Sequence, residues 1–494
     1  MMKKYQFWFV IGTQHLYGDS IFETIETRGK EMAKTLSDAV HPYAEVTFKT
    51  LLKTSDEIET LCKAANQQDD LAGIITWMHT FSPSKMWIKG LAKLQKPVLQ
   101  LHTQYNAHIP WDAIDMDFMN LNQSAHGDRE HGYIHTRMNR PRKVVSGYYK
   151  DPDVLKKIAQ WTRSAAGVLE SRRLNIVRIG DNMRYVAVTE GDKVGAEIQF
   201  GWSVNTFGSG DLAARVADVT QNELREQMVK YENRYTFATD QLDAVEYQAK
   251  LEIAIRKLCE AHHAKGFTTT FEDLSGLEQL PGLAAQDLML EGYGFAAEGD
   301  WKTAALLRVM KLMANGAGGG NSFMEDYTYH FENNQGYVLG AHMLEICPTI
   351  AAERPKIEVH PLGIGGKNPP ARAVFNAKAG PAIQVSLVDL GGRFRMIVTD
   401  CEAVEPFEDM PNLPVARAMW SLKPNFNVAT EAWLYAGGAH HTIMSYDLDA
   451  EVLRDFAAMM EIEFIHINAD TNIEALRKEL KWNDIAFRLQ QMGR

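Results

Sequence analysis

The first hundred residues of the chain alternate between strand and helix patterns, and this alternation restricts the fold more than any other feature. Short apolar runs predict buried strands at residues 5–11, 45–52, 71–78 and 97–102. Helical patterns separate these runs, and Thr54 with Glu57 predicts a capping box at the start of the second helix. Strands connected through helices run parallel, with helices over both faces of the sheet. The chain is therefore expected to begin with an α/β domain.

Polar side chains follow three of these predicted strands. The first strand is followed by residues 14–16 (Gln-His-Leu), the third by residues 79–81 (His-Thr-Phe) and the fourth by residues 102–104 (His-Thr-Gln). Each cluster alone is typical of a loop that hydrogen-bonds to its own backbone. All three, however, lie at the carboxyl ends of parallel strands, where ligands of such sheets gather. Together they predict a pocket at one edge of the first sheet.

Two further domains are predicted downstream. A second α/β unit begins with a strand at residues 175–179. Beyond residue 325 strand patterns dominate, and Gly391-Gly392 predicts a tight hairpin. The predicted strands there are residues 356–362, 372–376, 383–390 and 394–399. We therefore expect α/β domains at residues 1–170 and 171–325, followed by a β-rich, barrel-like domain at residues 326–494.

Size and charge exclude several classes of protein. At 494 residues the chain is too long for one ordinary core, in agreement with two to three domains. Its 52 basic and 63 acidic residues give a net charge of −11, which argues against a general binder of nucleic acid or of anionic membranes. No stretch is long and apolar enough to cross a bilayer. A soluble enzyme with neither nucleic-acid nor membrane partners is expected.

The cysteines and the N-terminus predict a cytoplasmic protein. The apolar run near the N-terminus stops at residues 13–15, which is too short for a signal peptide and has no small-residue cleavage site. No CxxC pair occurs, so free thiols are a simpler interpretation than a thiolate zinc site. The four cysteines are Cys62, Cys259, Cys347 and Cys401.

Three potential metal ligands lie between residues 294 and 345. Glu298 precedes a helix that Asp300 is expected to cap, whereas Glu325 and His342 fall in β-prone runs beyond a glycine-rich break. For each residue alone, a solvated or hydrogen-bonded side chain is the simpler interpretation. A carboxylate among apolar neighbours must nevertheless find a partner or shift its pKa. Two carboxylates and an imidazole of this kind could hold a divalent cation.

Three weaker patterns leave alternatives open. Residues 208–213 (GSGDLA) match a dinucleotide-binding fingerprint, but the preceding strand is unclear, so a plain turn between strand and helix is the better interpretation. Residues 363–367 (GIGGK) lack the first glycine and the Ser/Thr of a phosphate loop. His440 and His441 follow a glycine turn, and adjacent residues of a strand face opposite sides. One of these two histidines could therefore reach a site while the other packs elsewhere.

Nine long motifs follow one another along nearly the whole chain. They are FWFVIGTQHLYG, TWMHTFSPSKMWI, DMDFMNLNQSAHG, TTTFEDL, GYGFAAEGDWKTAAL, SFMEDYTYHF, GAHMLEICP, LGIGGK and AGGAHHT. Through them the sequence closely resembles the L-arabinose isomerase family. The resemblance implies two Rossmann-like α/β domains and a C-terminal β-rich domain, conversion of L-arabinose to L-ribulose, and for many members conversion of D-galactose to D-tagatose. It also implies Mn²⁺, with Co²⁺ as a substitute, and a homohexamer.

The resemblance also assigns roles to particular residues. The metal ligands would be Glu298, Glu325, His342 and His441, and the two glutamates would also be the catalytic acid and base. The choice of His441 over His440 rests on the resemblance alone. The substrate pocket would be lined by Gln14, Leu16, Phe81, His126, Met183, Phe271, Tyr327, Ile364 and His440. The N-terminal members of this set are expected to serve the site of a neighbouring subunit.

These residue types suit an aldose–ketose isomerisation of a small sugar. The reaction removes a proton from the carbon beside a carbonyl and must stabilise the resulting ene-diolate, for which a divalent cation acts as a Lewis acid. Mixed oxygen and nitrogen ligands suit Mn²⁺ or Co²⁺ better than a closed zinc site.

Three other functions compete with the isomerase. A metal-dependent lyase or dehydratase acting on a sugar acid could use the same ligands, and only its loss of water would distinguish it. A non-catalytic sugar-binding protein would need neither the metal nor the two carboxylates. A dehydrogenase would depend on residues 208–213 alone.

Overall fold

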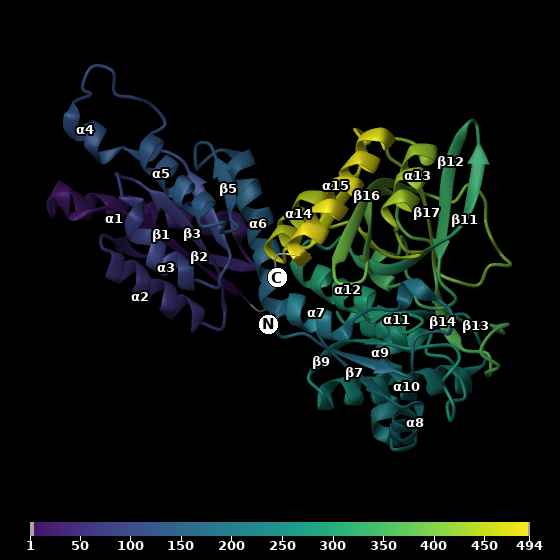
Figure 1. The fold of residues 1–494 in the computed structure, drawn as a ribbon. Helices are drawn as coiled ribbons and strands as arrows, with labels where there is room; N and C mark the ends of the chain where they lie inside the picture. Colours follow the sequence, from purple (N-terminus) through teal and green to yellow (C-terminus); the bar gives the residue numbers. More distant parts are fainter. Residues whose placement is uncertain (1–3, 493–494) are drawn as a thin grey trace. The chain divides into compact units, whose positions relative to one another are not determined.

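The computed structural model describes residues 4–492, and Figure 1 traces their path. The chain divides into two units. The first contains the residues up to Leu169 together with Glu451–Met459, and the second contains Glu170–Ala450 together with the residues from Met460 onward. Among the described residues, none of the helices combines the length and the apolar character that crossing a bilayer requires.

A five-stranded parallel sheet forms the centre of the first unit, as the strand–helix alternation predicts. The strands lie in the order β2-β1-β3-β4-β5, and every neighbouring pair is parallel. Their bounds are β1 Tyr5–Gly12, β2 Ala44–Leu52, β3 Leu71–Met78, β4 Val98–His102 and β5 Lys143–Ser146. All eight residues of β3 are buried, as expected of a central strand covered on both faces.

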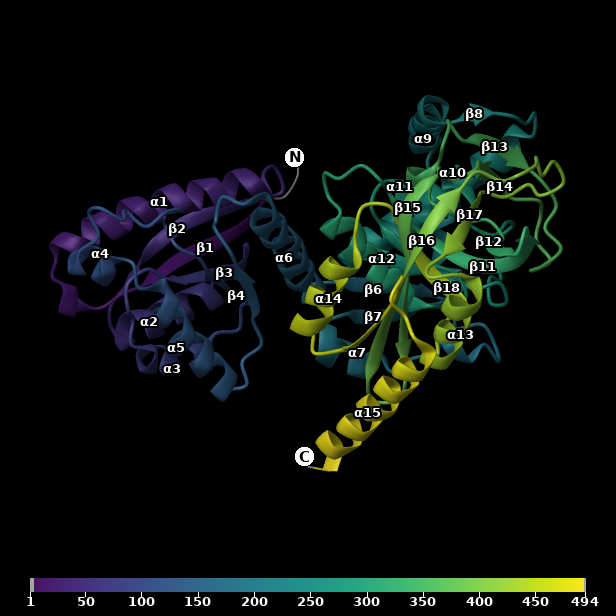
Figure 2. The ribbon, with the colours of Figure 1, turned by 90° about the horizontal axis from the view of Figure 1, so that it is seen from above.

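Helices cover both faces of this sheet. Figure 2 shows α1 on one face and α2, α3 and α5 on the other. The predicted capping box is present at the start of α2, where Thr54 and Glu57 exchange side-chain-to-backbone hydrogen bonds. The helices are α1 Ser20–Val40, α2 Ser55–Asn66, α3 Ile88–Lys93, α4 Met116–Leu121, α5 Ser124–Arg137 and α6 Pro152–Ser171, with short 3₁₀ turns η1 His15–Tyr17 and η2 Ser84–Trp87.

One late helix, α14 (Ala450–Met459), belongs to the first unit although it lies near the end of the chain. Lys143 of β5 forms ion pairs with Glu451 (2.5 Å) and Asp455 (2.8 Å) of this helix. The Ser164 hydroxyl of α6 donates to the Val452 carbonyl at 2.7 Å. Dividing the sequence into consecutive domains does not predict that this late helix belongs to the first unit.

The second unit starts with a four-stranded parallel sheet in the order β10-β9-β6-β7. Gly208 alone separates β7 from α8, and residues 209–213 begin the helix, so this stretch is a tight passage from strand to helix. The strands are β6 Asn175–Ile179, β7 Ser203–Phe207, β9 Ala264–Thr268 and β10 Gly294–Ala296. The helices are α7 Lys193–Phe200, α8 Ser209–Ala217, α9 Gln221–Arg234, α10 Leu242–Ala261, α11 Leu283–Leu290 and α12 Trp301–Met313, with η3 Ala187–Thr189.

A closed antiparallel barrel forms the C-terminal part of the second unit, as the strand-rich sequence predicts. Its six strands follow the order β15-β18-β11-β12-β17-β16, and pairing of β15 with β16 closes the ring. The hairpin at Gly391-Gly392 joins these two strands as predicted. The barrel strands are β11 Asn321–Glu332, β12 Gln335–Ala341, β15 Gly380–Asp389, β16 Phe394–Val404, β17 Arg417–Leu422 and β18 His441–Ser445, and β19 Glu463–Ile467 adds to β16 in parallel.

Two of the predicted C-terminal strands lie outside the barrel. They form a small sheet in the order β14-β13-β8, whose strands are β8 Thr236–Phe237, β13 Lys356–Val359 and β14 Ala371–Val374. The remaining elements are η4 Pro348–Ile350, α13 Phe426–Ala436 and α15 Ile473–Met492. One apolar core links the barrel to α9, and it includes Tyr231, Met324, Trp420 and Ile465. All four cysteines are free, as predicted, and all four are buried.

Candidate metal centre

Glu298 lies in a tight turn between β10 and α12. Its φ of 59° places a non-glycine residue in the left-handed region, and Gly299 follows with a φ of 77°. A Cβ at Gly299 would lie only 2.6 Å from the Cα of Asn182, so a side chain has no room there. Such uncommon backbone conformations concentrate at functional positions. The turn therefore marks Glu298 as a candidate functional residue.

Glu325, His342 and His441 come from three neighbouring barrel strands. Glu325 in β11 pairs directly with His441, the first residue of β18. His342 follows Ala341, which pairs with Glu325 from the other side at the end of β12. The Phe323 ring packs against both imidazoles, with ring centroids 5.0 Å from each. The register of the barrel thus brings together side chains that are far apart in sequence.

The four side chains predicted as ligands converge. Glu298 Oε2 lies 3.7 Å from His441 Nε2, and Glu325 Oε2 lies 3.8 Å from His342 Nε2. The two imidazole centroids are 5.9 Å apart. Both separations between oxygen and nitrogen exceed an ordinary hydrogen bond. Within residues 4–492, the buried Glu298 Oε2 and His441 Nε2 have no hydrogen-bond partner at all.

Two further carboxylates bind the other nitrogen of each imidazole. His342 Nδ1 donates to Glu345 at 2.6 Å, and His441 Nδ1 donates to Asp300 at 3.1 Å. Each bond leaves Nε2 directed at a glutamate, an arrangement typical of metal-binding histidines. Sequence reasoning identified Asp300 only as the cap of α12, a role that the structure confirms, and it missed Glu345. The available signal was spacing, because Glu345 lies three residues after His342.

The carboxylates and imidazoles of this centre shift one another's pKa. Burial alone would raise the pKa of Glu298, but His440 and His441 hold it below its ordinary value. Burial alone would lower the pKa of His342, yet Glu345 and Glu325 raise it above its ordinary value. The glutamate therefore favours its ionised form, and the imidazole favours a positive charge. Asp300 behaves like Glu298, because Lys302 and His441 outweigh burial and lower its pKa.

Five of the predicted pocket residues lie in the second unit, and two of them touch the four converging side chains. Phe271 stacks on His342 with centroids 5.8 Å apart, and the His440 ring lies 4.5 Å from that of His441. Of the other three, Met183 donates its backbone N–H to the Glu298 carbonyl, the Tyr327 hydroxyl donates to the Met343 sulfur, and half-buried Ile364 lies in the loop before Gly365.

The other four predicted pocket residues, Gln14, Leu16, Phe81 and His126, lie in the first unit. The loops after β1 and β3 meet there, since the Thr13 and Thr80 hydroxyls are 2.7 Å apart. The Phe81 and His126 rings are in contact, with centroids 5.0 Å apart. Leu16 is 80% exposed and lines a cavity of about 540 Å³ between η1, α1 and α4. Of the four predicted residues only Leu16 lines this cavity, whose other walls come from η1, α1 and α4, so the edge pocket formed by all three polar clusters stays a prediction.

Two groups of side chains meet the spacing of a metal site: Glu298 with His440 and His441, and Glu252 with Asp287 and Glu291. Glu252, Asp287 and Glu291 lie within 4.8 Å of one another through one oxygen each. Unlike the first group, these carboxylates form ion pairs with Arg234 and Arg256.

Comparisons with known proteins give a consistent result. Models of the N-terminal, central and C-terminal domains of L-arabinose isomerase match residues 1–173, 175–316 and 320–463. The L-arabinose isomerases of Geobacillus kaustophilus and Geobacillus stearothermophilus are each 53% identical over 494 residues, which cover 99% of both chains. That of Thermotoga neapolitana is 53% identical over 491 residues, again 99% of each chain. The similarity includes both units and the barrel.

Proposed function

The chain belongs to the L-arabinose isomerase family, and we propose that it converts L-arabinose to L-ribulose at the centre formed by Glu298, Glu325, His342 and His441. It is an aldose–ketose isomerase. The observation that carries the assignment of the site is the convergence of two carboxylates and two imidazoles from separate strands and turns, with unpaired buried atoms facing one another.

We assign one divalent cation to these four side chains, Mn²⁺ with Co²⁺ as a substitute. Carboxylate oxygens and imidazole nitrogens are suitable donors for these ions. The unpaired Glu298 Oε2 and His441 Nε2, 3.7 Å apart, fit a shared cation as their missing partner. When bound, the cation supplies Lewis-acid stabilisation of the negative charge that develops on the two reacting sugar oxygens.

The two glutamates have the roles of base and acid. One carboxylate removes the proton from C2 of the open-chain aldose, and the electrons of the broken C–H bond form a C1–C2 double bond. The other returns a proton to C1, and transfer of the O2 proton to O1 completes the ketose. Atoms and electrons balance without a redox cofactor. Because His440 and His441 lower the pKa of Glu298, this residue is well placed to hold the carboxylate form.

Other residues of the chain orient these groups. Asp300 and Glu345 accept hydrogen bonds from the Nδ1 atoms, so both imidazoles present Nε2 to the glutamates. Phe271 and Phe323 cover His342 with aromatic rings, which limits the access of water to that side of the centre.

We further propose a cytoplasmic homohexamer in which a neighbouring subunit supplies Gln14, Leu16, Phe81 and His126 to the pocket. The exposure of Leu16 and His126 on the first unit supports this assignment. The four free cysteines support a reducing compartment. Light scattering at micromolar concentration is expected to show a hexamer. A fully active monomer near 55.7 kDa would overturn it.

The function itself is tested by an aldose-to-ketose assay on a panel of sugars. The protein is assayed after treatment with EDTA and again after addition of Mn²⁺. We expect L-ribulose from L-arabinose and D-tagatose from D-galactose, with activity lost on chelation and restored by Mn²⁺. A product formed with loss of water would identify a dehydratase instead, and undiminished activity without metal would remove the cation from the reaction.

A further inference from the structure

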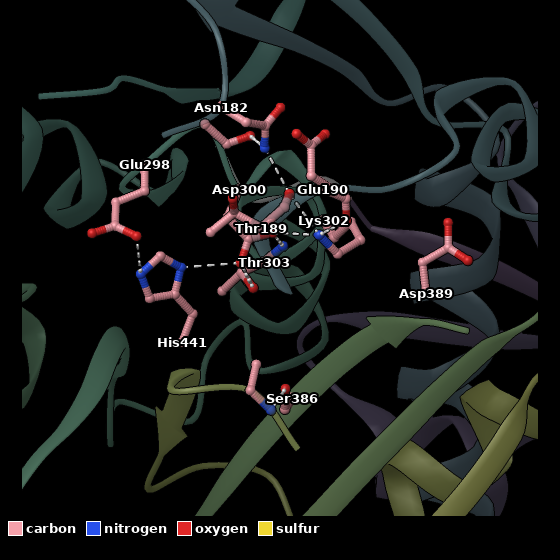
Figure 3. Close-up of polar contacts among 12 residues, drawn as sticks. Asn182, Thr189, Glu190, Glu298, Asp300, Lys302, Thr303, Ser386, Asp389 and His441 are labelled. Atoms are coloured by element: carbon pink, nitrogen blue, oxygen red, sulfur yellow. Dashed lines mark hydrogen bonds and ion pairs between the residues drawn. The ribbon is translucent and has the colours of Figure 1, made fainter. Parts of the chain in front are cut away.

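Lys302 is a buried cation beside the centre. It is the second residue of α12, and only 1% of its side chain is exposed. Its ammonium donates to Asp300 Oδ1 at 3.1 Å and to the carbonyls of Thr189 and Glu190 at 2.9 and 2.7 Å (Figure 3). An ammonium has three N–H groups, so these three acceptors use its whole bonding capacity. Its position is therefore fixed by the protein itself.

One of these bonds leads to the candidate metal ligand His441. Asp300 accepts from Lys302 through Oδ1, and through Oδ2 it accepts from His441 Nδ1 and from the Thr303 hydroxyl. Figure 3 shows the resulting chain of contacts from Lys302 through Asp300 and His441 to Glu298. A buried carboxylate needs a compensating charge to remain in place. Lys302 supplies that charge and so holds the acceptor that orients His441.

The other two bonds hold the loop segment 182–190, which carries the predicted pocket residue Met183. At the start of this segment, Asn182 Nδ2 donates to the Gly299 carbonyl at 3.1 Å, and the Met183 N–H donates to the Glu298 carbonyl at 3.0 Å. At its end, the lysine ammonium binds the last two carbonyls. One end of the segment is thus tied to the turn that contains Glu298, and the other to Lys302 in the first turn of α12.

We propose that Lys302 is a positioning residue that sets the His441 imidazole, through Asp300, and the Met183 segment at the same time. This inference rests on the proposed function, because it assumes a cation held by His441. Lys302 reaches neither Glu298 nor Glu325, so its influence passes through other residues. A lysine that served only the stability of the fold would not alter metal binding through Asp300, and this difference provides the test.

The test is a double-mutant cycle on metal affinity in the full-length protein. Lys302→Met, Asp300→Asn and the double variant are stripped of metal, and Mn²⁺ dissociation constants are measured by calorimetry. Changes to groups that orient metal ligands typically cost about 10–100-fold in affinity, and we expect this loss for Lys302→Met. In the Asp300→Asn background the same change is expected to cost less than about threefold, because the path is already broken. Wild-type affinity in Lys302→Met, or independent effects in the cycle, would overturn the proposal.

Lys311→Met is the matched control. Lys311 lies on the same helix and donates to the Asn321 carbonyl and to Cys347, away from the four ligands. Its loss is expected to leave Mn²⁺ affinity unchanged. If Lys302→Met does not fold, as judged by circular dichroism, the double variant carries the test because it removes both buried charges. A folded double variant with wild-type Mn²⁺ affinity would overturn the inference.

Hydrogen exchange provides a readout that does not depend on metal. We expect faster exchange in residues 182–190 of Lys302→Met than in the Lys311→Met control, and at saturating Mn²⁺ a larger rise in KM than fall in kcat. Unchanged exchange and unchanged KM would remove the segment from the proposal. If the wild type binds no Mn²⁺, the proposed function fails, while the exchange comparison still decides whether Lys302 holds the segment.

Discussion

Two clusters of the second unit meet the same metal-site spacing with different members: Glu298 with His440 and His441, and Glu252 with Asp287 and Glu291. In the cluster Glu252–Asp287–Glu291, the carboxylates pair with two arginines, Arg234 and Arg256. Tyrosines complete it, since the Tyr231 hydroxyl donates to Glu252 and that of Tyr235 to Asp287. Two permanent positive charges within the protein thus already offset most of the negative charge of this cluster.

The centre at Glu298 and Glu325 has no such compensation. Across residues 4–492, the ion-pair partners of these two glutamates are histidines alone, at 3.7–3.8 Å. Arginine is permanently charged and cannot give way to a metal, whereas a neutral imidazole offers an electron pair to one. From this comparison we infer that the chemistry of the partner side chains, and not the spacing alone, distinguishes the proposed metal site from the arginine-paired cluster.

The largest fall in turnover is expected from substitution of Glu298 or Glu325. Glu298→Gln and Glu325→Gln keep the shape of each side chain but remove a base, and general acid–base catalysis is typically worth about 10²–10⁴-fold. Turnover of L-arabinose should fall at least that far at saturating Mn²⁺, with metal occupancy confirmed for each variant. A metal-loaded Glu325→Gln enzyme that works at near wild-type rate would leave Glu325 as a ligand only. The hydrogen would then leave C2 as a proton taken up by water or His126, or move directly from C2 to C1 as a hydride.

A substitution in the arginine-paired cluster (Glu252, Asp287 and Glu291) should lower the stability of the fold and leave the activity of the centre in place. Arg256→Met leaves the fully buried Glu252 without its charge partner. Breaking a buried ion pair from one side costs about 3–5 kcal/mol. We expect the free energy of unfolding, measured in urea, to fall by about this amount while Mn²⁺ binding is retained. Loss of Mn²⁺ by a folded Arg256→Met protein would contradict the distinction between the clusters.

His342→Ala removes one proposed ligand and the imidazole partner of buried Glu345, which keeps its bond from the Leu344 N–H, and circular dichroism checks that the fold persists. We expect Mn²⁺ affinity to fall by more than about 100-fold, because losing a ligand weakens binding more than losing a residue that only orients a ligand. Metal analysis of the purified variant measures the result. Undiminished stoichiometry and affinity would exclude His342 from the centre.

A change of pH is expected to alter Mn²⁺ affinity less than these substitutions do. Glu345 and Glu325 raise the pKa of His342 above its ordinary value despite burial, so in the metal-free protein a proton competes for this imidazole. A cation must displace that proton, and Mn²⁺ affinity should therefore weaken as pH falls through the raised pKa and level off above it. The change is at most about tenfold per pH unit for one proton. Glu345→Gln should move the loss of affinity to lower pH, and an unmoved profile would contradict this origin.

Local patterns in the sequence predicted the elements of the fold well. Apolar runs and caps are local signals, and they indicated the first parallel sheet, the capping box at Thr54 and the hairpin at Gly391. Strand β7 was missed because its five residues are exposed or only half-buried and show no apolar alternation. The return of α14 to the first unit was missed because it depends on Lys143, about three hundred residues earlier.

The sequence alone identifies only some of the residues of the candidate centre. Glu298, Glu325 and His342 were singled out by their local surroundings, whereas His441 required the family resemblance because adjacent histidines look alike in sequence. The roles of Asp300, Glu345 and Lys302 follow from contacts that barrel register and turn geometry create. Pairing of Glu325 with His441 across β11 and β18 has no counterpart in local periodicity.

The most direct test of the account is the position of Mn²⁺ in crystals of the wild-type protein. Anomalous diffraction near the manganese edge locates the ion without reference to activity. The account predicts a single strong peak per chain among Glu298, Glu325, His342 and His441, and none at Glu252, Asp287 and Glu291. A peak within the arginine-paired cluster, or no peak between the two glutamates and two histidines at saturating Mn²⁺, would contradict it.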